Sequence, residues 1–272
     1  MKPLTVAVAQ LCSGEDKEAN LQKAETYIRQ AAQKGAKLIV FPEWMNYIGS
    51  THNPSTWEPV PGGESCQRMA NAAKKNCIWV HMGTVLETVD GSEKAYNTSA
   101  LFSPMGNVVA TYRKTHLCDI MDTPQTVIRE SDTTTPGDEI VTVKTELGHI
   151  GMSICYDVRF PELYRKMALE GAEILCHPAC FGCTTGSAHW ELLVRSMALH
   201  TGSYVLAAGQ CGNRPNGISK WGHSMIVDPW GTVIAQAGQE QEALLVADIH
   251  LDDVKQIRER LGMLHNRRVE IY

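Results

Sequence analysis

The chain has 272 residues, with 25 Lys and Arg against 30 Asp and Glu, a formal net charge of −5 and 43% hydrophobic residues. This is enough for one large α/β domain or two small ones, and the acidic balance argues against nucleic acid as the main partner. No apolar run is long enough to span a bilayer or to read as a secretory leader, and nine cysteines is an odd number. We therefore expect reduced thiols, a cytoplasmic location and no membrane partner.

Short β-type runs alternate with segments of helical period along the whole chain. The predicted strands are Thr5–Ala9, Leu38–Phe41, Ile78–Leu86, Asn97–Phe102, Val108–Tyr112, Ile140–Val143, His149–Ile154, Ile174–Cys176, Tyr204–Ala208, Ser224–Val227, Thr232–Ala235 and Ala243–Asp248. The predicted helices follow Asp16, Ser65, Phe160 and Asp252, with one more around Trp190 that ends at Gly202. No linker interrupts this order, so residues 1–272 are predicted to form one domain, with 262–272 as an arm that could reach a partner subunit.

Two pairs of segments repeat within the chain. Gly35–Pro42 matches Gly171–Pro178, each a helix stop followed by a buried strand and a proline. Ser103–Ala110 matches Asp228–Ala235, each a hairpin with Pro and Gly at the places that a type I turn prefers. Unless common turn residues coincide by chance, two similar halves are fused into one domain. Each half would be a sheet with helices on one face, and the two bare faces are best buried against each other. The predicted fold is therefore α/β, with four layers in the order α-β-β-α.

Cys155 lies where an apolar run, Ile150–Ile154, ends and a helix-like segment begins. A side chain at such a junction can be held rigidly while facing a cleft, and nearby helix amides favour a thiolate, so the position suits a nucleophile. The alternative is that Cys155 is a small buried hydrophobic residue, as free cysteines often are.

Two more chemically distinct groups stand at strand ends. Glu43 follows the predicted strand Leu38–Phe41, and Lys114 follows Val108–Tyr112. The carboxyl ends of strands are where α/β sheets bind ligands. A glutamate in a dry pocket could take the thiol proton, and a lysine could hold a developing oxyanion. Taken singly, Glu43 could be a solvated acid and Lys114 a surface lysine.

Three separated motifs resemble the Glu-Lys-Cys signature of the nitrilase superfamily of carbon–nitrogen hydrolases. They are Phe41-Pro-Glu43, Arg113-Lys-Thr-His-Leu117 and Cys155-Tyr-Asp-x-Arg-Phe-Pro-Glu162, and the resemblance covers essentially the whole chain. It implies a four-layer α-β-β-α sandwich, in agreement with the internal repeats, and an enzyme that hydrolyses linear amides through a thioester on Cys155, with Glu43 as base. It also implies that Lys114 and the backbone N–H of Tyr156 hold the oxyanion.

Within the superfamily the chain is most similar to the omega-amidase and deaminated-glutathione amidase branch. Thr184–Leu193, Cys155–Glu162 and the C-terminal Arg267–Tyr272 carry this similarity. Ala208–Gly212 resembles the deaminated-glutathione type, whereas Thr184–Gly186 and Lys220–His223 resemble the omega-amidase type, so both sub-branches stay open.

The resemblance implies a supporting role for Glu130, which would fix Lys114 and the bound amide by hydrogen bonding. Without the resemblance, Glu130 could equally be a loop acid before Pro136. Arg159 lies four residues past Cys155, and on a helical turn it would share a face with the thiol. It could then bind a substrate carboxylate, with Thr185 as a further candidate. The alternative for Arg159 is an ion pair with Asp157 or Glu162.

The expected function is omega-amidase-like cleavage of a small carboxylate-bearing amide, such as an α-keto acid amide, to a carboxylate and ammonia. Deaminated glutathione, N-carbamoyl amino acids and nitriles are alternative substrates. No metal or organic cofactor is expected, and the family implies a homodimer or a higher homo-oligomer.

Alternative hypotheses concern functions other than amide hydrolysis. Cys176, His177, Cys180 and Cys183 are spaced closely enough to suggest zinc, although Cys176 and His177 are adjacent on a strand and should point to opposite faces. A redox pair at Cys180 and Cys183 lacks a thioredoxin-like context. A non-catalytic scaffold is disfavoured by intact Glu43, Lys114 and Cys155.

Overall fold

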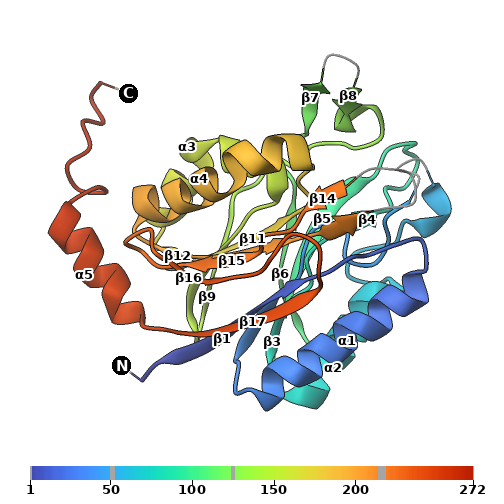
Figure 1. Ribbon diagram of the computed structural model, residues 1–272, viewed down its shortest axis with the longest axis horizontal. Coiled ribbons are helices and arrows are strands. Elements are labelled where there is room, and N and C mark those ends of the chain that lie inside the picture. The colour runs from blue at the N-terminus through green and yellow to red at the C-terminus, as the bar shows by residue number, and fades with distance from the viewer. Residues whose placement is uncertain (1, 50–52, 124–125, 214–218, 272) are drawn as a thin grey trace.

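The computed structural model describes residues 2–49, 53–123, 126–213 and 219–271, and places two large β-sheets between two layers of helices (Figure 1). The strands of the seven-stranded sheet, from one edge, are β17 (Ala243–Ile249), β1 (Leu4–Gln10), β2 (Leu38–Val40), β3 (Trp79–His81), β5 (Tyr96–Phe102) and β4 (Val85–Glu87), with β6 (Val108–Arg113) also beside β5. Those of the six-stranded sheet are β16 (Val233–Gln236), β15 (Met225–Val227), β12 (Tyr204–Gly209), β11 (Ile174–Ala179), β10 (Gly148–Met152) and β9 (Val141–Thr145).

Two small strand pairs and five α-helices complete the described fold. Two smaller pairs of strands lie outside the large sheets: β7 (Asp119–Thr123) with β8 (Thr126–Arg129), and β13 (Cys211–Asn213) with β14 (Ser219–Trp221). The helices are α1 (Lys17–Gln33), α2 (Glu64–Asn76), α3 (Pro161–Leu169), α4 (Cys183–Thr201) and α5 (Leu251–Leu261). In Figure 1, α1 and α2 cover the outer face of the seven-stranded sheet, and α3 and α4 cover that of the six-stranded sheet.

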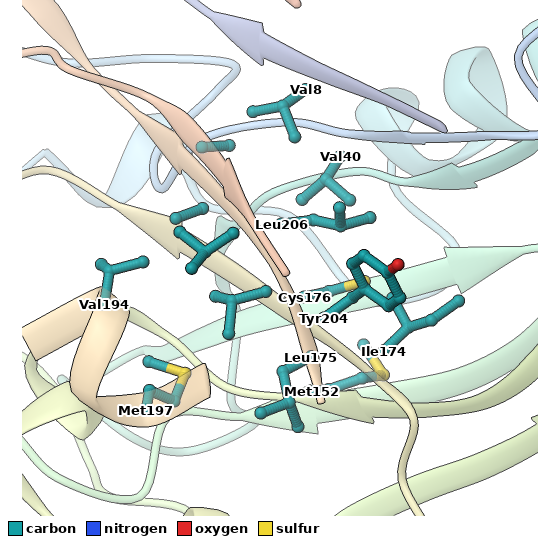
Figure 2. Packing of buried hydrophobic residues seen from close by; sticks show 14 of the residues in the cluster. Val8, Val40, Met152, Ile174, Leu175, Cys176, Val194, Met197, Tyr204 and Leu206 are labelled. Carbon is teal, nitrogen blue, oxygen red and sulfur yellow. The ribbon is translucent and has the colours of Figure 1, made fainter. Parts of the chain in front are cut away.

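The apolar pattern of the sequence explains this layering. In α1 the apolar residues Leu21, Ala24, Ile28 and Ala31 are buried, and Asp16 begins the helix by accepting the N–H of Ala19 at 2.9 Å. Between the sheets, Val8 and Val40 meet Met152, Cys176 and Leu206 in one core (Figure 2). Each fully buried side chain of this kind contributes about 1.5–3 kcal/mol of transfer free energy, so the interface between the sheets contributes much of the stability.

The internal repeat predicted from sequence is present in the structure. The series β1, β2, β3, β5 and β6 occurs in the same spatial order as β10, β11, β12, β15 and β16, with the first three strands of each parallel. The two hairpins close alike: Gly106 N–H donates to Ser103 O and Gly231 N–H to Asp228 O, both at 2.9 Å. Together these features confirm the α-β-β-α sandwich of two similar halves.

Some predicted elements were wrong in detail. The single strand predicted over Ile78–Leu86 is two strands, β3 and β4, separated at Gly83. Gly83 has φ +71°, and a Cβ there would lie 2.0 Å from the carbonyl oxygen of Pro42, so the chain must turn away at this close approach. The strands β7, β8, β13 and β14 were not predicted. The helix expected after Ser65 begins at Glu64, and the one expected after Asp252 begins at Leu251.

Beyond α5 the chain forms turns at Gly262 and Arg268 rather than a regular element, and the predicted family residue Tyr272 lies outside the described residues. None of the described helices combines the length and apolar character that crossing a membrane requires.

The carboxyl ends of the parallel strands in both sheets meet at one edge of the sandwich. Leu11 and Gln210, which directly follow β1 and β12, form a parallel bridge, with the N–H of Cys211 donating to Leu11 O at 2.8 Å. Side chains that follow β2, β6 and β10 are therefore brought toward the same edge.

Candidate active site

Glu43 lies three residues beyond β2 and is 1% exposed. The backbone around it is held from two directions. Thr84 accepts the N–H of Trp44 through its hydroxyl at 2.9 Å and the N–H of Met45 through its carbonyl at 3.1 Å. From the other half of the molecule, the Gln210 side-chain amide donates to the carbonyl of Glu43 at 3.0 Å. The carboxylate therefore sits on a rigid turn.

Lys114 directly follows β6 and is 2% exposed. Its N–H donates to Asn97 O at 2.9 Å, and its carbonyl accepts the N–H of Gly137 at 2.8 Å. The ammonium Nζ lies 3.1 Å from Glu43 Oε1 and 2.7 and 3.0 Å from the two carboxylate oxygens of Glu130. The three predicted residues Glu43, Lys114 and Glu130 are thus in direct contact.

Asn97 and Cys118 also hold the carboxylates, and sequence reasoning missed both. The Asn97 amide donates to Glu43 Oε1 at 2.8 Å and to Glu130 Oε1 at 3.2 Å. The backbone N–H of Cys118 donates to Glu130 Oε2 at 2.6 Å. The only signal for Asn97 was an amide within the predicted strand Asn97–Phe102, where a buried polar group needs a partner.

The charge of Lys114 is secured by its neighbours. Burial alone would lower the pKa of its ammonium, but the carboxylates of Glu130 and Glu43 and the nearby Cys155 sulfur outweigh burial and raise that pKa well above its usual value. Lys114 therefore stays protonated. Because it is buried, water screens its positive charge little, so the ammonium would interact strongly with a nearby negative charge.

Cys155 begins the 3₁₀ helix η3 (Cys155–Arg159), three residues after β10, and is 8% exposed. Its φ of +47° is unusual for a residue with a side chain and is typical of strained turns at functional sites. Burial, and then the negative charge of Glu43, raise the pKa of the thiol well above its usual value, against the lowering effects of Lys114 and of the Cys180 N–H. The surroundings of the sulfur therefore favour the neutral thiol, whereas a helix start alone favours the thiolate.

Arg159, at the end of η3, is half-buried and has no ion pair with a carboxylate among the described residues. Neither alternative partner binds it, because Asp157 is bound by other donors and Glu162 belongs to the exposed start of α3. Both Nη1 and Nη2 lie 3.3 Å from His189 Nδ1, and Nε is buried without a hydrogen-bond partner. The guanidinium is thus available for an anion.

The charged groups around the Cys118 thiol indicate where Arg159 lies relative to the candidate site. Burial raises the pKa of the Cys118 thiol to about 11, and the charges of Lys114, Glu130, Glu43 and Arg159 also act on it. Arg159 therefore lies near Cys118, whose backbone N–H binds Glu130.

Of the other two predicted residues, Tyr156 contacts this guanidinium and Thr185 lies on a neighbouring helix. The Tyr156 ring centroid lies 5.6 Å from Arg159 Cζ, within the range of a cation–π contact. Thr185 lies in the first turn of α4, one helical turn before His189, and is half-buried. The structure therefore brings Tyr156 into contact with Arg159 and places Thr185 on the helix that contacts it.

The residues of the zinc hypothesis are dispersed. Cys176 is buried between the sheets, whereas His177 Nδ1 lies 3.0 Å from Ser153 Oγ and 3.2 Å from Tyr164 OH. Throughout the described ranges, no three His, Cys, Asp or Glu side chains are grouped so as to hold a metal ion.

The family of the chain follows from comparison with known proteins. The carbon–nitrogen hydrolase family model matches residues 5–259. The chain belongs to the carbon–nitrogen hydrolase family. This confirms the predicted resemblance, and it makes the protein a hydrolase that acts on carbon–nitrogen bonds other than peptide bonds.

Two groups of relatives of this carbon–nitrogen hydrolase match almost its full length. It is 40% identical to the deaminated glutathione amidase of Bos taurus over 98% of this chain and 83% of the relative. It is 39% identical to the omega-amidase NIT2 of Homo sapiens over 100% of this chain and 98% of the relative. The Saccharomyces cerevisiae protein Nit3, a member of branch 10 of the nitrilase superfamily, has a TM-score of 0.88 at 34% identity, covering 98% of this chain and 97% of Nit3.

Proposed function

We propose that this carbon–nitrogen hydrolase is a thiol amidohydrolase that cleaves the amide bond of a small carboxylate-bearing amide, with Cys155 as nucleophile. The observation that carries the proposal is the buried contact of Glu43, Lys114 and Glu130 near the buried Cys155 thiol, whose pKa responds to the charges of Glu43 and Lys114. A base, a fixed cation and a nucleophile together are the groups that acyl transfer needs. The amidase names of both groups of relatives support an amide as the substrate.

In the first half of the reaction, Glu43 takes the Cys155 proton as the sulfur attacks the amide carbonyl. Because the thiol is neutral at rest, proton transfer and attack must be coupled. The oxyanion is stabilised by the Lys114 ammonium and by the N–H of Tyr156, which lies at the start of η3 where helical N–H groups lack intrahelical acceptors. Glu43 then protonates the leaving nitrogen, and ammonia departs from a thioester.

In the second half, Glu43 takes a proton from water as the water oxygen attacks the thioester carbonyl. The same cation and N–H stabilise the second oxyanion, and its collapse releases the carboxylate and returns the proton to Cys155. Glu130 and Asn97 hold Lys114 and Glu43 in place through both halves.

Arg159 supplies the recognition of the substrate carboxylate in this proposal, with Thr185 beside it. We expect Arg159→Met to raise KM for carboxylate-bearing amides by about 10- to 100-fold, because hydrogen bonds to a charged group contribute about 1.5–3 kcal/mol. KM for a neutral amide should stay unchanged. Steady-state kinetics on both substrates measures the difference. The matched control is Arg165→Met on α3, which removes a guanidinium that donates to the carbonyl oxygen of Met263. An equal rise in KM for both substrates of Arg159→Met would contradict the assignment.

The test of the proposed function is ammonia release by the purified protein across a substrate panel. The panel contains 2-oxoglutaramate-like amides, deaminated glutathione, N-carbamoyl amino acids and simple nitriles. We expect the highest kcat/KM with an α-keto acid amide or with deaminated glutathione, and these two outcomes separate the two sub-branches. Hydrolysis of nitriles or carbamoyl compounds alone, with no amide turned over, would refute the proposal.

We also propose a homodimer or higher homo-oligomer in the cytoplasm. Leu192 and Leu199 on α4 and Trp230 in the β15–β16 turn are exposed, as are Val269 and Ile271 in the 262–272 segment. Exposed large apolar side chains of this kind would be covered in a subunit contact. All nine cysteines lie in the described part of the chain and none forms a disulfide, which fits a reducing compartment.

A further inference from the structure

Asp157 is fully buried two residues after Cys155, and its carboxylate accepts four hydrogen bonds. Oδ2 accepts from the Ile154 N–H at 2.8 Å and from the Tyr112 hydroxyl at 2.7 Å. Oδ1 accepts from the N–H and the ring Nδ1 of His116 at 3.1 and 2.8 Å. A buried carboxylate with this many donors is held in one orientation, because losing any of them leaves a polar group unsatisfied.

The donors come from both sides of the candidate site. Tyr112 and His116 stand two residues before and two residues after Lys114, whereas Ile154 directly precedes Cys155. One carboxylate therefore joins the segment that carries the cation to the segment that carries the nucleophile. These segments belong to different sheets and are far apart in sequence, since His116 and Asp157 are separated by 41 residues.

The surroundings make this link stiff. Burial and the negative charge of Asp157 raise the pKa of Tyr112 well above its usual value, so the phenol stays protonated and donates. The His116 ring stacks on Phe160 with centroids 3.7 Å apart and the planes at 7°. Phe160 directly follows η3, so His116 contacts the nucleophile segment twice, through Asp157 and through Phe160.

We propose that Asp157 is a positioning residue that fixes the Lys114 ammonium relative to the Cys155 sulfur without itself contacting substrate. This inference rests on the proposed function, in which those two groups act on one carbonyl. The oxyanion must lie within hydrogen-bond distance of Lys114 while the sulfur attacks its carbon, and a misplacement of about 1 Å costs about 100-fold in rate. Arg159 is also held through His189 on α4, so we expect substrate binding to depend less on this link than the reaction does.

The test is Asp157→Asn, which keeps the shape of the side chain but puts an amide NH2 in place of one acceptor oxygen. That NH2 faces hydrogen-bond donors, so at least one of the four hydrogen bonds is lost. We expect kcat, normalised to folded protein, to fall about 100-fold with KM within about threefold of the parent. Tyr112→Phe removes a single donor and should lower kcat by a smaller factor with the same unchanged KM. The Tyr112→Phe result decides the matter where Asp157→Asn does not fold.

Asp228→Asn is the matched control, since the Asp228 carboxylate also accepts two N–H groups, those of Trp230 and Thr232, in the β15–β16 turn. It should lower the unfolding temperature and leave kcat unchanged. A parental kcat in folded Asp157→Asn or Tyr112→Phe, or a loss confined to KM, would overturn the inference. Turnover by Cys155→Ala would instead overturn the proposed function, so the two failures are distinguishable.

Discussion

Cys155→Ala is expected to abolish amide hydrolysis while the protein stays folded. Cys155 is the nucleophile of the proposed mechanism, so kcat should fall by at least about four orders of magnitude, as for other nucleophile deletions. The loss of one buried sulfur costs only about 1 kcal/mol of stability. Ammonia release measures the activity, and thermal unfolding measures the fold.

Thiol labelling gives an independent measurement of the same residue. In the parent protein, iodoacetamide labelling of Cys155 should be slowed by a substrate amide and should remove activity in proportion to its extent. The exposed Cys77 supplies the control, since Cys77→Ser removes an accessible thiol and should leave turnover intact. Substantial ammonia release by Cys155→Ala would exclude the thioester route.

Lys114→Met has the second largest expected effect, and it acts on both activity and stability. Removing the oxyanion cation should lower kcat/KM by about 10²–10³-fold or more. It also leaves the Glu43 and Glu130 carboxylates buried without their cation, which costs about 3–5 kcal/mol. The loss of stability should shrink as the pH falls, because one carboxyl can then take up a proton and relieve the unpaired charge.

Unfolding curves at pH 8 and pH 5.5, alongside steady-state kinetics, measure both effects. Lys94→Met is the matched control. Lys94 is exposed and donates to the carbonyl of Ser131, next to Glu130, at 2.6 Å. It should keep activity and stability at both pH values. If Lys114→Met retained activity within tenfold of the parent, the oxyanion role of the lysine would be excluded.

The sequence predicted the layers, and it also indicated the main residues of the candidate site, because both leave local signals. Buried strands are short apolar runs between glycines and prolines, and the repeat of Gly35–Pro42 at Gly171–Pro178 reveals two halves. Glu43, Lys114 and Cys155 stand where such runs end. These features concern neighbours in sequence, so they can be read without knowing which segments meet.

The contacts that hold the site could not be predicted from single positions. Asn97 reaches Glu43 across 54 residues, and Gln210 reaches it across 167. A lone amide or carboxylate in an apolar segment shows that a partner must exist but not which residue it is. The break at Gly83 was missed for the same reason, since the obstacle is the carbonyl of Pro42, about forty residues away in sequence.

The repeat of two halves gives the molecule an inherent asymmetry. When Pro42 and Pro178 are placed at equivalent positions, Ala179 stands where the first half has Glu43, and Ala179 is buried without a charge. The acid and the amine thus come from the amino-terminal half and the sulfur from the carboxyl-terminal half. Under the proposed mechanism a chain of this design carries one acyl group at a time, and neither half separated from the other would hold a complete set of the proposed reacting groups.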